Sequence, residues 1–156
     1  MHLANGSPAF DTIFLAAQAY VLLFLFLHDW LPLGTLNNFT AKRDADSFAN
    51  RAFVTLLPAV PAALGLYYCA KDFTQPYSHG LLILLWITYG SFLFGMLRAW
   101  WVPYLLVPDP ARAARYQTIF AGTHRFLPER NGITPDTLHT TLHAVTLAIV
   151  VLLLIR

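Results

Sequence analysis

Four long apolar segments constrain the fold of this chain more than any other feature of its sequence. They cover about residues 9–28, 51–70, 80–101 and 135–155. Each is close to the roughly 20 residues that a helix needs to cross the hydrocarbon core of a bilayer. Because lipid offers no hydrogen-bond partners, the backbone groups of such segments must pair within helices. The sequence therefore predicts an all-α, polytopic membrane protein built as a bundle of four transmembrane helices.

Little of the chain is left for anything outside this bundle. Of its 156 residues, 57% are hydrophobic and 12% are charged, about half the charged fraction of a typical soluble domain. We therefore expect residues 1–156 to form one integral membrane domain. In the third connection, Asp109 and Pro110 are typical of a helix start, and the mixed character of residues 110–121 predicts a short interfacial amphipathic helix.

The distribution of positive charge predicts the orientation of the bundle. Lys and Arg gather in the first and third connections, whereas the N-terminal tail has none and the second connection has only Lys71. Positive residues mark cytoplasmic loops, so both termini should lie outside. The net charge of +2 is thus a signal of topology, and we expect no nucleic-acid partner. Residues 28–34 and 123–128 resemble motifs of small bacterial membrane proteins, but they point to no family of known activity. We expect a multi-pass protein of a bacterial inner membrane.

The last apolar segment carries a polar stripe at one end. Thr134 is predicted to cap this helix, with Pro135 at its first position. Four polar residues then follow at i, i+3, i+7 and i+10, a spacing that places them on one helix face: Asp136, His139, His143 and Thr146. His143 should lie below the lipid headgroups, where ionisable side chains usually face the bundle interior or a wet cavity.

Other polar residues are predicted to meet this stripe at the cytoplasmic end. The third segment repeats the same spacing with Thr88, Ser91, Gly95 and Arg98. The second segment begins at Arg51. The remaining candidates for ligand contacts flank the helices: His28, Asp29, His124 and Arg125. Together these residues predict a His/Arg cavity that opens toward the cytoplasm.

The favoured interpretation is a site for an amphiphilic or anionic, lipid-like substrate. Arg98 and Arg51 would bind a phosphate or carboxylate through charge-assisted hydrogen bonds. His139 or His143 would act as general acid or base, and Asp136 would orient one imidazole. The partners would then be membrane lipids or a small amphiphilic ligand, which the protein either binds or also converts.

Two alternatives stay open at this point. Histidines at i and i+4, here His139 and His143, can share one divalent metal ion if a third ligand joins them; the candidates are His28, Asp29, Asp136 and His124. Haem is disfavoured, because no second helix offers a histidine at membrane depth. Alternatively, the stripe is a hydrogen-bonded packing network in a structural or transport subunit, or in a homo-oligomer.

Overall fold

The computed structural model describes residues 7–156 and confirms the predicted all-helical class. Its long helices are α1 (Pro8–Leu27), α3 (Phe48–Lys71), α4 (His79–Met96) and α7 (Thr137–Leu154). All four are long and apolar enough to cross a membrane. The protein is therefore a multi-pass helical membrane protein, with spans close to those that the apolar segments predicted.

Shorter helices fill the connections. The first contains η1 (Gly34–Leu36) and α2 (Phe39–Ala45). Beyond α4 the chain continues through a π-helical turn, η2 (Leu97–Trp101), into α5 (Val102–Leu105). The interfacial helix predicted at 110–121 corresponds to α6 (Pro110–Ile119). Asp109 caps α6 by accepting the backbone N–H of Arg112 at 3.0 Å.

Serine residues set the starts of three of the long helices. Ser7, Ser47 and Ser78 each accept a hydrogen bond from the backbone N–H three residues later, at 3.2 Å in every case. Such a bond satisfies one of the donors that the first helical turn leaves open. The boundaries of α1, α3 and α4 are therefore encoded locally, next to the apolar runs.

The start of α7 differs from the prediction that Thr134 caps it. Asp136 is the N-cap: its backbone is extended, and its carboxylate accepts the backbone N–H of His139 at 2.8 Å. Aspartate is a stronger N-cap than threonine. From this position the same carboxylate also contacts the imidazole of His139, with Oδ2 at 2.9 Å from Nδ1. Asp136 therefore lies before the first turn of α7 instead of within it.

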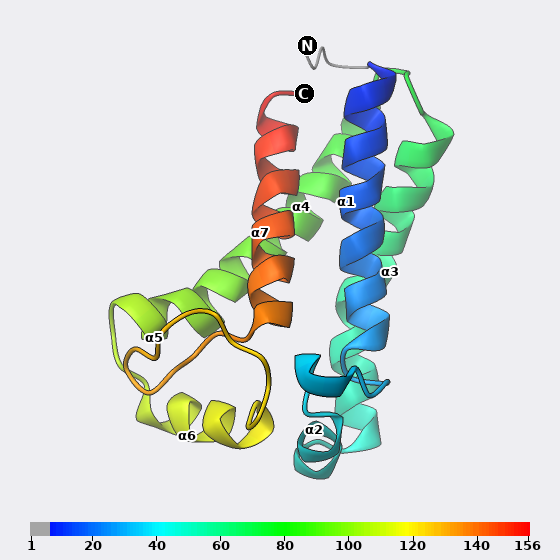
Figure 1. The fold of residues 1–156 in the computed structure, drawn as a ribbon. Coiled ribbons are helices and arrows are strands. Elements are labelled where there is room, and N and C mark those ends of the chain that lie inside the picture. The colour runs from blue at the N-terminus through cyan, green and yellow to red at the C-terminus, as the bar shows by residue number, and fades with distance from the viewer. Residues whose placement is uncertain (1–6) are drawn as a thin grey trace.

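The four long helices form a closed ring. Helix α1 packs against α3 and α7, and α4 packs against the same two helices. The start of α1 and the end of α7 lie together at what we call the terminal end (Figure 1). Helices α2 and α6 lie at the opposite, loop end. Helix α4 leans across the bundle, so that α5 and α6 extend beside the first turns of α7.

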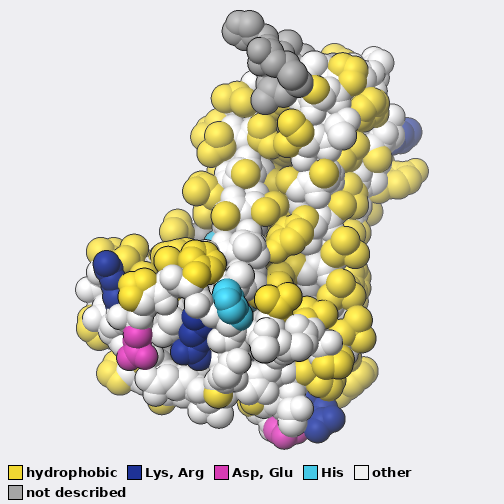
Figure 2. Space-filling view, viewed as in Figure 1, with side chains coloured by type: hydrophobic (Ala, Val, Ile, Leu, Met, Phe, Trp, Pro, Cys, Tyr) yellow, Lys and Arg dark blue, Asp and Glu magenta, His cyan; other side chains and the backbone are white. Residues whose placement is uncertain are grey.

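The surface of the bundle is apolar along most of its length. Hydrophobic side chains cover the long part of the visible face, and most of the charged side chains in this view gather at the loop end (Figure 2). Large apolar residues that would be buried in a soluble protein are exposed here, including Phe53, Leu57, Ile87 and Phe94. This surface suits hydrocarbon better than water.

A buried ion pair joins the helices at the terminal end. The guanidinium of Arg156 donates to the carboxylate of Asp11 in the first turn of α1, lies 3.2 Å from the ring centre of Tyr77, and donates to the Gln75 carbonyl at 3.2 Å. The other Asp11 oxygen accepts the backbone N–H of Thr74 at 2.7 Å. Asp11 thus ties α1 to the end of α7 and to the α3–α4 connection.

Candidate functional site

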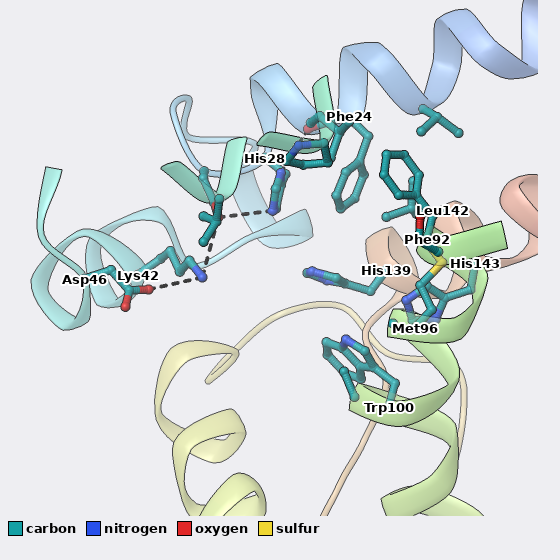
Figure 3. Close-up of a pocket in the computed structure, with 18 of the residues that line it drawn as sticks. Phe24, His28, Lys42, Asp46, Phe92, Met96, Trp100, His139, Leu142 and His143 are labelled. Carbon is teal, nitrogen blue, oxygen red and sulfur yellow. Dashed lines mark hydrogen bonds and ion pairs between the residues drawn. The ribbon is translucent and has the colours of Figure 1, made fainter. Parts of the chain in front are cut away.

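A cavity of about 640 Å³ lies among the helices at the loop end. Its lining residues come from α1, α2, α3, α4, α6 and α7 and from the turns beside them (Figure 3). Most of the wall is apolar, but one side carries imidazoles and charged groups. The residues labelled in the close-up view are Phe24, His28, Lys42, Asp46, Phe92, Met96, Trp100, His139, Leu142 and His143. We call this space the loop-end cavity.

His139 is held by a carboxylate on one side and by aromatic rings on the others. Its Nδ1 lies 2.9 Å from Oδ2 of Asp136, and Oδ1 of that carboxylate accepts the backbone N–H of His139. The indole of Trp100 stacks on the imidazole with the ring centres 4.8 Å apart. Phe24 and Phe120 contact it edge-on at 5.4 Å and 4.9 Å. The ring is therefore fixed in one orientation.

Asp136 determines which nitrogen of His139 is available. Burial raises the pKa of Asp136, but hydrogen bonds and charge interactions with His139 outweigh it, so that its pKa lies below the ordinary value. An ionised carboxylate accepts the Nδ1 proton, which leaves the lone pair on Nε2. Within residues 7–156 nothing forms a hydrogen bond with Nε2. His139 therefore offers an oriented proton acceptor beside the cavity.

His143 lies one turn further along α7 and lines the same cavity. Its ring centre is 6.3 Å from that of His139, and Trp100 and Trp101 contact it edge-on. Only 5% of the residue is exposed, and among the described residues its Nδ1 has no hydrogen-bond partner. The predicted stripe thus does bring both histidines to one site.

The charged groups of the cavity were not predicted, except for Asp29. Nζ of Lys42 lies 3.2 Å from Asp46 and 3.9 Å from Asp29. Arg115 of α6 binds both oxygens of Asp46, at 2.9 Å and 3.1 Å. Partial burial raises the pKa of Asp46, but the hydrogen bonds from Arg115 and Lys42 bring it below the ordinary value. The first connection therefore forms part of the wall.

His28 closes the cavity just beyond the end of α1. Its Nδ1 lies 2.9 Å from the Phe24 carbonyl and its Nε2 lies 3.2 Å from Asp29, while its ring centre is 5.7 Å from that of His139. Burial lowers the pKa of His28 from 6.5 to about 4, although Asp29 opposes the effect. The folded protein therefore holds His28 neutral at pH 7.

This burial predicts a pH dependence of stability. Below pH 6.5 the unfolded chain protonates His28 whereas the folded protein does not, so stability falls as the pH drops from 6.5 toward 4. Between pH 7 and pH 5 the contribution of His28 should be about 2 kcal/mol. Thermal unfolding in detergent at both pH values should show a smaller difference for His28→Gln than for the wild type. The control His124→Gln, at an exposed position, should keep the wild-type difference in stability between the two pH values. An equal reduction of that difference in both variants would contradict its assignment to His28.

Two of the predicted arginines do not line the loop-end cavity. Arg51 is buried between α1 and α3, where it donates to the Asp29 carbonyl at 3.2 Å and lies 5.0 Å from the ring centre of Trp30. It fastens the end of α1 to α3. Arg98 is exposed. The expected pairing of Arg98 and Arg51 around one ligand is therefore not what the structure forms.

The π-helical turn η2 explains the position of Arg98. Thr88 is buried and Ser91 and Gly95 line cavities, as an α-helical face predicts. A π-helical turn bonds residues i and i+5 and so accommodates an extra residue. After η2 begins, positions no longer follow the α-helical period, and Trp100 instead of Arg98 faces His139. The sequence pattern gave no indication of this shift.

His124 and Arg125 hold the segment that leads into α7. The exposed His124 ring lies 2.7 Å from the Thr137 hydroxyl, and its backbone N–H donates to the Thr35 carbonyl at 2.7 Å. Arg125 donates to the Phe120 carbonyl at 2.6 Å. Neither residue lines the loop-end cavity. In this structure both serve to position the segment 120–136.

The described residues do not complete a metal site. No group of three His, Cys, Asp or Glu side chains within residues 7–156 could hold a metal ion. Nδ1 of His139 is already engaged by Asp136. The shared metal ion of His139 and His143 stays a prediction.

A second cavity, of about 460 Å³, lies between α3 and α4. Four residues line both spaces: Val54, Pro58, Ser91 and Phe92. The rest of the second wall is almost entirely apolar and includes Phe53, Leu57 and Ile87, which are exposed on the surface of the bundle. We call it the α3–α4 groove. It adjoins the loop-end cavity and reaches the apolar surface of the bundle.

The loop-end cavity can accommodate a molecule that is mainly apolar and carries one polar group. Phe24, Phe92 and Met96 supply the apolar wall, and Nε2 of His139 can accept a proton from a bound hydroxyl or water.

Comparisons of this chain with protein-family models, with curated proteins and with solved structures find no match.

Proposed function

We propose that this protein binds a membrane amphiphile in the loop-end cavity, with the polar group of the ligand at His139 and His143. One observation supports this above the others: the cavity has oriented imidazoles in its wall and shares four lining residues with the apolar α3–α4 groove. Sites for small molecules commonly combine an apolar wall with a few fixed polar groups. A packing network alone would have no need of a cavity of this size.

A second function, chemical conversion of the ligand, is supported by the Asp136–His139 pair. Nε2 of His139 would accept a proton from a water molecule while the oxygen of that water attacks an ester carbonyl of the ligand. The imidazolium would then return the proton to the leaving alcohol. Asp136 would stabilise the imidazolium formed in between. The reaction consumes one water and yields an acid and an alcohol.

We further propose that the loop end faces the cytoplasm of a bacterial inner membrane. The excess of Lys and Arg in the first and third connections supports this orientation, because such residues favour the cytoplasmic side. The site would then take its ligand from the inner leaflet.

Two glycines of α4 provide a matched test of binding. Among residues 7–156, a Cβ atom at Gly95 or at Gly90 would meet nothing within 4 Å, and of the two only Gly95 lines the loop-end cavity. Gly95→Phe should fill the cavity without strain. We expect wild type and Gly90→Phe, purified in mild detergent, to retain an amphiphile at about one molecule per chain. Mass spectrometry of the extracted lipids should find at least tenfold less with Gly95→Phe.

Two results would overturn the proposed binding. One is a wild-type preparation that retains no amphiphile and takes none up from added lipid. The other is equal retention by wild type and Gly95→Phe. Either result would favour a structural or transport subunit, or a homo-oligomer, in which the polar residues only fix helix packing.

A further inference from the structure

The charged groups in the wall of the loop-end cavity compensate one another. Lys42 and Arg115 are the cations of the wall, and Asp29 and Asp46 are its anions. Asp46 binds both cations, at 3.2 Å from Lys42 and 2.9 Å from Arg115. Asp29 has Lys42 at 3.9 Å and the neutral imidazole of His28 at 3.2 Å, so the two cations balance the two carboxylates. No cation of this wall is left over to bind an anion.

A charged head group would therefore be disfavoured in this cavity. An anion would displace Asp46 from its cations, or would lie beside two carboxylates in a poorly solvated space. A cation would meet carboxylates that already have their partners, next to Lys42. The arginine that could have changed this balance, Arg98, is exposed elsewhere. The wall suits a group that forms hydrogen bonds but carries no charge.

The α3–α4 groove provides a place for one long hydrocarbon chain. It joins the cavity at Val54, Pro58, Ser91 and Phe92, and its wall has almost no polar surface. A ligand whose head lies at His139 can therefore extend its chain past Ser91 and between the two helices. The chain would remain in contact with lipid along the outer side of the groove.

We infer that the ligand is a single-chain amphiphile with an uncharged head group, such as a hydroxyl, ketone or ester. The head binds at His139 and His143, and the chain lies in the α3–α4 groove. This inference rests on the proposed binding function and specifies the class of ligand. It replaces the anionic ligand that the arginines of the sequence suggested.

Oleyl and oleoyl ligands that differ in the charge of their head group test the inferred preference for an uncharged head group. Monooleoylglycerol and oleyl alcohol are uncharged, oleoyl lysophosphatidate is anionic, and oleylamine is cationic at pH 7. In competition against radiolabelled monooleoylglycerol on purified wild-type protein, we expect the uncharged ligands to bind at least tenfold more tightly than the charged ones. Equal or tighter binding of a charged ligand would overturn the inference and leave the binding function intact. No specific binding of any ligand would overturn both.

A variant at a residue shared by the cavity and the groove tests where the hydrocarbon chain of the ligand lies. Ser91→Leu adds bulk at a residue that lines both spaces. Within residues 7–156 the Ser91 hydroxyl bonds only to carbonyls of its own helix. We expect the substitution to weaken binding of monooleoylglycerol at least tenfold and to leave binding of a four-carbon monoacylglycerol unchanged. Gly90→Leu, at the neighbouring position, should behave as wild type. Equal weakening of the long-chain and short-chain ligands would overturn the place of the chain in the groove.

Discussion

Replacing Asp11 with alanine is expected to lower the free energy of unfolding by about 3–5 kcal/mol, because it removes one partner of a buried ion pair. The Asp11 residue is 0% exposed and the Arg156 side chain 4%. The substitution removes the carboxylate that compensates the guanidinium, and it also removes the acceptor for the Thr74 backbone N–H. Thr74 has a φ of 62°, a conformation that a β-branched residue adopts only when it is held there. Unfolding in mixed detergent micelles, followed by circular dichroism, measures the change.

Two further variants distinguish a buried pair from a surface one. Leucine at both Asp11 and Arg156 removes both charges and should recover much of the lost stability. The control is Asp44→Ala, which breaks an exposed pair with Arg43. It should have little effect, since exposed pairs contribute little. A loss for Asp44→Ala equal to that for Asp11→Ala would contradict the special role of the terminal end.

Replacing Asp136 with alanine should have the second largest effect, a loss of about 2–4 kcal/mol. The substitution removes the N-cap of α7, which contributes about 1 kcal/mol. It also leaves the Nδ1–H of His139 without its acceptor in a buried position, at a further cost of about 1–3 kcal/mol. The same unfolding measurement in detergent applies. Bound ligand should decrease in parallel, because the ring of His139 loses its fixed orientation.

Serine at position 136 separates the two effects. Its hydroxyl can still cap α7 but is too short to hold the imidazole. Asp136→Ser should therefore recover about 1 kcal/mol of stability relative to Asp136→Ala. If the pair also catalyses hydrolysis, release of oleic acid from monooleoylglycerol should stay low in both variants. Wild-type hydrolysis by Asp136→Ser would exclude Asp136 from that reaction.

The fold could be predicted from the sequence because hydropathy and capping act locally. Length and apolar composition set the four spans, and Asp109 with Pro110 set the start of α6. The same local logic failed once, at Thr134. There the choice between two capping residues depended on His139, one turn away, whose ring also needed the carboxylate of Asp136.

The candidate site was harder to predict because half of it depends on tertiary structure. His28, Asp29, His139 and His143 line the cavity as expected. Lys42 and Asp46 join it only because α2 folds back under the bundle, which a polar loop sequence does not reveal. The ion pair of Asp11 with Arg156 joins residues near opposite ends of the sequence. Its one sequence signal was an aspartate inside an apolar segment, where a charge requires a partner.

The π-helical turn η2 also determines where α4 can vary in length. A connecting loop tolerates the loss of a residue, since its neighbours can rearrange. In η2 a one-residue deletion would remove the extra residue and restore the α-helical hydrogen-bonding pattern, so the residues on both sides would keep their orientations. Trp100 would then still cover His139. A deletion in the α-helical part of α4 would instead rotate Trp100 and α5 by about 100° about the helix axis. The extra residue between Gly95 and Trp100 is therefore the place where this helix can shorten without losing the site.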